Sequence, residues 1–382
     1  MRLLIKLELQ KLFRRKYVVG GALILLAYTL FLFFGYGMHS RVTFPVNTED
    51  DSLLEGRAAM LYNKEIYEQY AGELTDKNVA EILNDYWNLR EKQEMEYSHL
   101  TNVPIIYEDF ALFKVTDYDN NDRALSSYGN ISINATDLPK FEKPLFFTFS
   151  YAWRTIFNIL YNANIVFALF LLITIAPLFA EEYSSGADGV ILTTRYGKSK
   201  GIYAKMVVAL LVATLAVVAF ALFVLLICGL YFNGLTGWQA DVQTQFDSLL
   251  MLVPIRMNNL QFYLFAVSMY WLSAIGTAML SCCCSAMCKK TFTACITSSV
   301  LYLIPVLPRQ IGVVNEFVRE CMLIFPVWAS KSEQVLRTSE HKYVNLLPIA
   351  CEMPIWIAIF TLFATIVLLR ISYKSFSTHQ VE

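Results

Sequence analysis

FAEEYSSGADGVILTTRYGKSKGIYAK, residues 179–205, is a short polar segment between two long apolar runs. No residue in 155–180 carries a charge, and none in 206–240 does. Each run exceeds the roughly 20 apolar residues that an α-helix needs to cross the hydrocarbon core of a membrane. The segment between them ends in a cluster of Lys and Arg, so the positive-inside rule predicts that it is cytoplasmic. Its acidic start and glycine-broken middle favour a short helix across the membrane face; an ordinary solvated loop is the alternative.

The rest of the chain has the composition of a helical membrane protein. Of its 382 residues, 56% are hydrophobic and 16% are charged, against about 25% charged in soluble proteins. The basic residues border the apolar runs and form no broad stripe, which argues against nucleic-acid binding. The first apolar run is too long for a signal peptide, so we expect no cleavage there. The sequence predicts an all-α polytopic protein.

Apolar runs and the basic residues beside them divide the chain into about six spans, with both termini in the cytoplasm and the protein in the plasma membrane. In chain order the expected segments are an interfacial amphipathic helix at 1–16, span one at 17–38, an extracytoplasmic insert at 39–154, span two at 155–180, a cytoplasmic coupling loop at 181–205, span three at 206–232, an outer loop at 233–259, span four at 260–287, span five at 291–307, an outer loop with a possible re-entrant segment at 308–352, span six at 353–369 and a cytoplasmic tail at 370–382.

The first 16 residues are typical of a helix that lies in the membrane interface. On a helix, their apolar side chains form an imperfect stripe, and basic groups on the other face suit anionic lipid headgroups. The alternative is a basic flank that only sets topology. The candidate residues of the interfacial helix are Ile5, Leu9, Leu12, Phe13, Arg14 and Arg15.

The insert at 39–154 is far longer than an ordinary connection, so it should have a structure or function of its own. It is predicted to be mainly helical, with helices at 51–73 and 76–96, the second capped by Asp76. Residues 128–133 favour a short strand. The acidic tract at 117–122 lacks the glycine and distal glutamate of a calcium-binding loop, so a calcium site is disfavoured.

Span two contains three amides, at Asn158, Asn162 and Asn164, and Pro177 interrupts it near its inner end. Amides in a membrane must find partners, so these side chains should face other helices or a polar pathway. Helix packing is the favoured interpretation, and a pathway is the alternative.

Four cysteines, at 282–284 and 288, lie at the inner end of span four. Thiolates can bind zinc, but three adjacent cysteines on a helix point in different directions. Packing as small apolar side chains is therefore favoured. A disulfide between Cys321 and Cys351 is an open possibility, because both residues fall in a predicted outer loop.

The polar segment contains no complete nucleotide-binding motif. Gly197–Ser199 reads GKS, but a phosphate-binding loop needs a glycine where this chain has Leu192. Any ATP hydrolysis is therefore expected in another chain. Glu181 and Glu182 lack the downstream arginine expected of an intramembrane protease, because Gly186 stands in its place.

Taken together, these parts resemble the permease subunit of bacterial type-2 ATP-binding-cassette exporters, in which the permease and the ATPase are separate chains. The resemblance covers most of the chain except the insert. Its sharpest part is the acidic pair, the glycine, the apolar-threonine step and the basic residues that follow, although the proline common in this turn is absent. The resemblance implies that the segment couples to an ATPase, through Glu181, Glu182, Gly186, Ile191, Leu192, Thr194, Arg195 and Lys198.

The same resemblance implies the partners. They would be a dimer of a separate ATPase that binds ATP and magnesium, a second permease (the same chain or a related one), and membrane lipid. This chain would bind no cofactor and would form the pathway for a hydrophobic or amphipathic substrate, such as a peptide antibiotic, a lipid or a drug. The alternative function is a membrane-anchored sensor or scaffold whose insert binds a ligand.

Overall fold

The computed structural model describes residues 1–38, 41–44, 52–94, 104–112, 141–194, 196–245, 249–310, 318, 321–339 and 352–378. The chain forms two compact units. The first unit comprises Met1–Phe31, Leu160–Phe223 and Phe265–Glu382, and the second comprises Leu32–Ile159 and Val224–Leu264. We describe each unit by itself.

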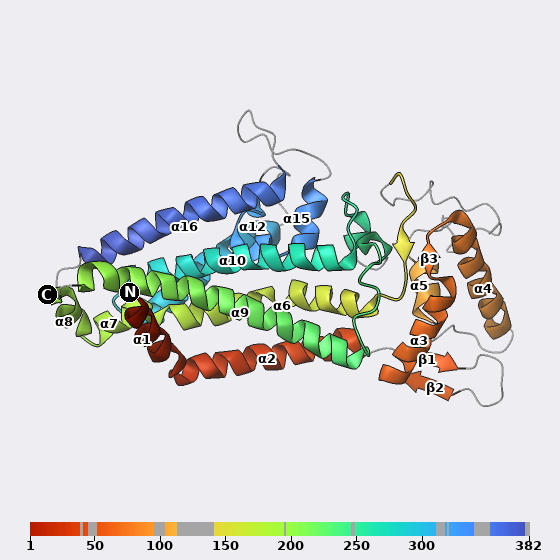
Figure 1. The fold of residues 1–382 in the computed structure, drawn as a ribbon, viewed down its shortest axis with the longest axis horizontal. Coiled ribbons are helices and arrows are strands. Elements are labelled where there is room, and N and C mark those ends of the chain that lie inside the picture. The colour runs from red at the N-terminus through yellow and green to blue at the C-terminus, as the bar shows by residue number, and fades with distance from the viewer. Residues whose placement is uncertain are drawn as a thin grey trace. The chain divides into compact units, whose positions relative to one another are not determined.

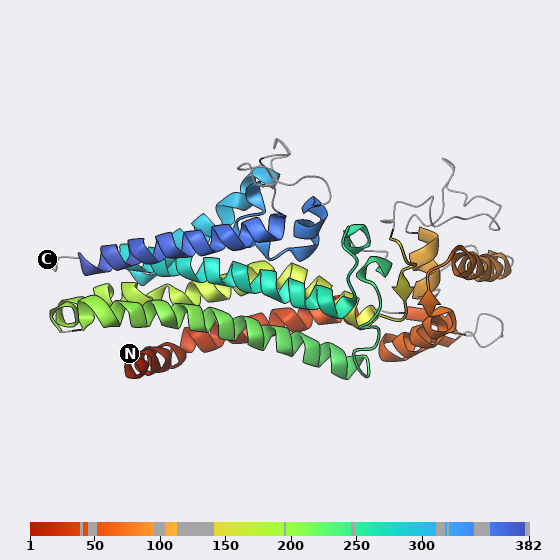
Figure 2. The same cartoon turned by 45° about the horizontal axis from the view of Figure 1, so that its top comes forward.

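Five described helices are long and apolar enough to cross a membrane, as expected of a multi-pass helical membrane protein. The helices of the first unit, among them α9, α10 and α16, extend in similar directions (Figures 1 and 2). The five candidate spans are α2 (Lys16–Gly37), α6 with α7 (Tyr151–Ile175 and Pro177–Ser184), α9 with the π-helical turn before it (Ile202–Tyr231 and Gly197–Gly201), α10 (Asn259–Met287) and α16 (Met353–Ser377).

The fifth of the six expected spans differs from the others. Helix α11 covers Thr291–Leu303 and continues through a short 3₁₀ turn at Ile304–Val306, so it is apolar but shorter than the other candidates. Pro305 lies in this turn, and a proline removes a helical hydrogen-bond donor. The described residues therefore supply five helices of spanning length rather than six.

The described part of the predicted outer loop at 308–352 includes the short helices α14 (Pro326–Ala329) and α15 (Ser332–Ser339). Val327 and Trp328 are buried in an apolar cluster that also includes residues of α6, α10 and α16. The Trp328 indole donates a hydrogen bond to the carbonyl of Pro305, 2.9 Å away. The Ser273 hydroxyl donates to the carbonyl of Pro326 at 2.6 Å. A Cβ added to Gly276 of α10 would lie 2.9 Å from Pro326 Cγ, so small residues on α10 allow α14 to pack closely.

Among its described residues, the second unit includes two short antiparallel strand pairs and three α-helices that lie wholly within it. Strand β1 (Arg41–Phe44) pairs with β2 (Ser52–Glu55), and β3 (Gly72–Glu73) pairs with β4 (Phe146–Phe147). The helices are α3 (Gly56–Tyr70), α4 (Asp76–Glu94) and α5 (Ile105–Leu112). Ile82, Leu83, Ile106, Phe110 and Phe147 are among the side chains of its own apolar core.

Two details of this unit differ from the sequence prediction. The helix expected at 51–73 covers only Gly56–Tyr70, because residues 52–55 form strand β2 and residues 72–73 form strand β3. The N-cap of α4 is Thr75 rather than Asp76, since the Thr75 hydroxyl accepts a hydrogen bond from the Asn78 N–H at 3.3 Å. The strand predicted at 128–133 and the acidic tract at 117–122 lie outside the described residues.

Candidate functional site

The polar segment begins where α6 breaks and α7 starts, at Pro177. The break leaves backbone groups without helical partners, and Ser285 of α10 satisfies them. Its hydroxyl oxygen accepts hydrogen bonds from the N–H groups of Phe179, at 2.9 Å, and Ala180, at 3.1 Å, and the hydroxyl donates to the carbonyl of Ala176. The serine therefore holds α7 in a defined position against α10.

A buried ion-pair network joins three helices beside this break. Lys205 lies at the start of α9, and its side chain is 3% exposed. Its ammonium group is 2.6 Å from Glu182 of α7 and 3.0 Å from Glu8 of α1, and it donates to the carbonyl of Leu178 at 2.9 Å. A lysine has three N–H donors, so these three acceptors satisfy it. We call Glu8, Glu182 and Lys205 the buried ion network.

A second, more exposed set of charges lies between α1 (Arg2–Phe13), the residues after it, and α7. Arg15 forms an ion pair with Glu181, and the ammonium of Lys11 is 3.9 Å from the same carboxylate. Burial and the neighbouring Lys205 lower the pKa of Lys11 from its ordinary value. Figure 1 shows α1, α7 and α8 near one another at the end of the first unit where the chain begins.

The predicted interfacial stripe divides into buried and exposed side chains. Leu12 is 1% exposed, whereas Ile5 and Leu9 are half-buried. Phe13 is 53% exposed, and Arg14 is also exposed. The buried part of the stripe therefore packs against protein, and Phe13 and Arg14 remain available to other molecules.

The turn after α7 contains a glycine that the backbone requires. Gly186 has φ of 67°, in the left-handed region that is costly for residues with a Cβ. It is the N-cap of α8, which covers Ala187–Thr193. Asp188 and Leu192 of α8 are buried, Ile191 is half-buried, and Val190 is 70% exposed. This short helix presents one apolar side chain outward.

The end of α8 makes close contact with the π-helical turn that leads into α9. A Cβ added to Gly197 would lie 1.7 Å from the carbonyl oxygen of Ile191, so only glycine fits there. The hydroxyl of Thr194 donates to the same carbonyl at 2.7 Å. Lys198 is exposed, and Arg195 lies outside the described residues.

Residues 197–201, GKSKG, match the G-x-S-x-G pattern of hydrolases, so the expectation that this chain lacks that pattern is wrong. That pattern carries a nucleophile only on a sharp turn from a strand into a helix. Here the five residues form the π-helical turn that runs directly into α9. The local structure is therefore not that of a nucleophile elbow.

The three amides of span two occupy different environments. Asn164 is 3% exposed and donates hydrogen bonds to the carbonyl of Val327, at 3.0 Å, and to the hydroxyl of Ser330, at 3.1 Å. It thus joins α6 to the segment containing α14, as a packing role requires. Asn158 and Asn162 are half-buried.

The cysteines at the inner end of α10 show no arrangement for a metal. Cys282, Cys283 and Cys284 are buried, and Cys288 is half-buried. In the described part of the chain, no group of three or more His, Cys, Asp or Glu side chains is placed to hold a metal ion. Cys351, the second half of the possible disulfide, lies outside the described residues.

The second unit has a polar cluster of its own. Arg154 is 3.2 Å from Asp109, and the Tyr67 hydroxyl donates to the same carboxylate at 2.6 Å. Burial raises the pKa of Asp109, although Arg154 and Tyr67 act in the opposite direction. The adjoining cavity has a volume of about 20 Å³, which is room for about one water molecule.

Two members of the buried ion network, Glu8 and Lys205, and Ser285, which holds α7, were not predicted as site residues. Glu8 carried a signal, because it is the one acidic residue among the first sixteen. Lys205 was recognised only as a topological charge. Ser285 carried no signal distinct from that of other small residues in an apolar helix.

No protein-family model matches this chain, and no curated protein sequence does. The chain is a multi-pass helical membrane protein with a charged network at the end of one unit.

Proposed function

We propose that this chain is the permease subunit of an ATP-driven exporter, coupled to a separate ATPase subunit. Two permeases, identical or related, would enclose a pathway for a hydrophobic or amphipathic substrate. ATP and magnesium would bind in the partner, and this chain would be a transport subunit without catalysis of its own. Its termini and the 181–205 segment would lie in the cytoplasm of a cell whose plasma membrane holds it.

The observation that carries this proposal is the buried ion network. It joins α1 and α9 to α7, the helix that precedes α8. Packed helices and buried pairs change position in discrete steps rather than by bending, so a displacement of α8 would move α7, α9 and α1 together. This is the mechanical property that a coupling segment needs.

The exposed side chains of the same segment suit a protein partner. Val190 is 70% exposed and Tyr196 is 45% exposed, and both are apolar or aromatic. Lys198 and Lys200 are exposed beside them, and Lys200 lies 4.6 Å from the centroid of the Tyr196 ring. Interfaces combine an apolar centre with a charged rim in this way.

ATP would act through its affinity for two states of the partner. A ligand shifts a conformational equilibrium only by its differential affinity for the states. ATP that favours the closed ATPase dimer would press on residues 181–205 and on α1. Hydrolysis would release that pressure, and the spans would return.

The test is copurification of the chain with its candidate ATPase from membranes, followed by ATPase assay in lipid nanodiscs. Val190 is exposed in the free chain, so Val190→Glu should leave the fold intact and place a charge in the expected interface. The variant should reduce copurification and the stimulated rate of ATP hydrolysis about tenfold. Leu61→Glu, at an exposed position of α3 in the second unit, is the matched control. Equal behaviour of both variants and the parent chain would refute the docking assignment.

The sensor or scaffold function remains the second proposal, because the second unit has its own apolar core. The polar cavity described there fits about one water molecule and so gives little support for a ligand. An ATPase that never copurifies with the chain, together with a ligand that stabilises the second unit, would favour this function over transport.

A further inference from the structure

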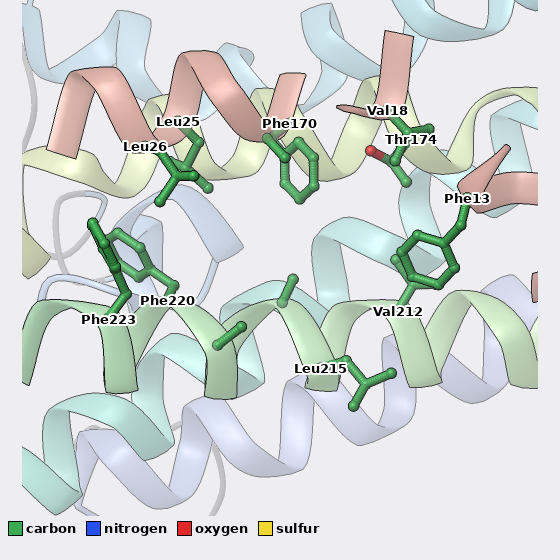
Figure 3. A pocket seen from close by; sticks show the side chains of 13 residues that line it. Phe13, Val18, Leu25, Leu26, Phe170, Thr174, Val212, Leu215, Phe220 and Phe223 are labelled. Carbon is green, nitrogen blue, oxygen red and sulfur yellow. The ribbon is translucent and has the colours of Figure 1, made fainter. Parts of the chain in front are cut away.

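A groove in the first unit, separate from the charged network, has room for part of a ligand. It lies among the start of α2, α6 and α9, and its volume is about 350 Å³, within the range of about 300–1,000 Å³ for small-molecule sites. Figure 3 shows Phe13, Val18 and Thr174 near one end and Leu25, Leu26 and Phe223 near the other. Apart from Thr174, its labelled lining side chains are apolar.

The length of the groove matches one leaflet of a membrane. Its lining on α9 extends from Val212 to Phe223, a helical rise of about 16 Å. The hydrocarbon core of a bilayer is about 30 Å thick, so one leaflet contributes about half of this. An acyl chain from a single leaflet therefore fits the groove end to end.

One polar atom in the groove lacks a partner. Thr174 is 1% exposed, and its hydroxyl has no hydrogen-bond partner among the described residues. A buried hydroxyl without a partner is costly, so an occupant with an acceptor at this point would be favoured. The ester oxygens of a phospholipid lie between the acyl chain and the headgroup, where such an acceptor is needed.

The chain next to that end of the groove is positively charged. Arg14 and Lys16 are both exposed, and they lie in the sequence between the lining residues Phe13 and Val18. The neighbouring Arg15 is already paired with Glu181. Two exposed cations at the headgroup level attract the phosphate of an anionic lipid.

We propose that this groove is a binding site for one anionic phospholipid of the leaflet next to α1. One acyl chain lies along α9, an ester oxygen accepts a hydrogen bond from Thr174, and Arg14 and Lys16 hold the headgroup. This site goes beyond the proposed transport function and does not depend on it. Its occupant would tie the α1–α2 junction to α6 and α9.

The experiment measures lipid retained by the purified full-length chain, using native mass spectrometry. The probes are phosphatidylglycerol and phosphatidylcholine with identical acyl chains, added in equal amounts to delipidated protein. The parent chain should retain one phosphatidylglycerol in preference to phosphatidylcholine. Equal retention of the two lipids would overturn the anionic site.

Three variants locate the site. Ala219→Trp fills the groove and should lower phosphatidylglycerol retention about tenfold, whereas Val218→Trp, at the adjacent exposed position outside the lining, should leave it unchanged. Thr174→Val preserves the side-chain shape and should lower retention about three- to tenfold. Arg14→Gln with Lys16→Gln should abolish the preference for the anionic lipid.

Other outcomes would contradict the proposal directly. If Ala219→Trp and Val218→Trp reduce retention equally, the bound lipid is only part of the general lipid belt. If Ala219→Trp leaves retention unchanged but dissociates a dimer of the chain, a second copy covers the groove. If Thr174→Val leaves lipid retention unchanged, the Thr174 hydroxyl does not bind the lipid, and the position assigned to the lipid ester is wrong.

Discussion

Lys205 carries a charge that is almost fully buried, and the residues around it decide what its loss would do. Replacing one partner of a buried ion pair leaves the other charge without compensation, at a cost of about 3–5 kcal/mol. Lys205→Met should therefore lower the free energy of unfolding by about this amount, measured by denaturation in detergent. Lys205→Met combined with Glu182→Met should lose less, because both charges are then removed.

The matched control is Lys198→Met, which removes an exposed charge from the same segment. Its effect should be within about 0.5 kcal/mol, as for other surface substitutions. Equal destabilisation by Lys205→Met and Lys198→Met would contradict the burial of the network.

Gly197 is a second residue whose substitution should have a clear effect. Because a Cβ there would overlap the carbonyl of Ile191, Gly197→Ala must shift α8 or the π-helical turn. We expect loss of ATPase stimulation with the chain still present in the membrane. Gly201→Ala is the control, since its Cβ would lie 3.4 Å from the nearest atom, the carbonyl oxygen of Tyr196. A normal rate for Gly197→Ala would show that this contact is unimportant.

Glu333 predicts a pH dependence. It is 8% exposed, and burial raises the pKa of its carboxyl to about 7, with Lys331 acting in the opposite direction. The folded state therefore holds the proton more tightly than the unfolded state, whose carboxyl has a pKa of about 4.3. The contribution of protonated Glu333 to the free energy of unfolding is fully present below the unfolded-state pKa. It is lost as pH rises through the folded-state pKa of about 7.

The parent chain in detergent should accordingly have a higher Tm at pH 5.5 than at pH 8, all else equal. Glu333→Gln should remove this part of the pH dependence, because the amide does not titrate. An unchanged slope of Tm with pH in Glu333→Gln would rule out the assigned role.

At the scale of the element, α7 depends on a hydroxyl from another helix. Ser285→Ala leaves the N–H groups of Phe179 and Ala180 and the carbonyl of Ala176 without that partner. Each unsatisfied buried group costs about 1–3 kcal/mol, so the variant should be clearly less stable in thermal unfolding. Ser298→Ala should have a smaller effect, because the Ser298 hydroxyl donates to Cys295 within its own helix. The reverse ranking would contradict the bracing of α7.

Elements of this chain differ in how far the sequence predicts them. A run of 20 or more apolar residues satisfies its own backbone in lipid, so α2 and α9 follow from composition alone. Helix α11 was harder to predict, because the expected span at 291–307 is α-helical only to Leu303 and continues as a 3₁₀ turn that contains Pro305. Residues 52–55 form strand β2 instead of the expected start of a helix because they pair with β1, and the local sequence pattern does not predict this pairing.

For the whole molecule, the position of the polar segment could be predicted from the sequence, but the buried ion network that holds it could not. The position of residues 181–205 between two apolar runs is visible in the sequence. The pairing of Glu8 with Lys205 joins residues 197 positions apart, and neither has a local signal for the other. The buried ion network was therefore visible only in the structure, whereas most of the membrane-spanning helices could be predicted from the sequence.

We propose that residues 186–198 dock a separate ATPase. The most direct measurement places a photo-crosslinking amino acid at Val190, which is 70% exposed, and at Leu61 of the second unit as the control. After illumination of intact cells, the account predicts a covalent adduct between the ATPase and the chain labelled at 190, and none with the chain labelled at 61. An adduct at 61 alone, or none at either position while both chains are present, would contradict it.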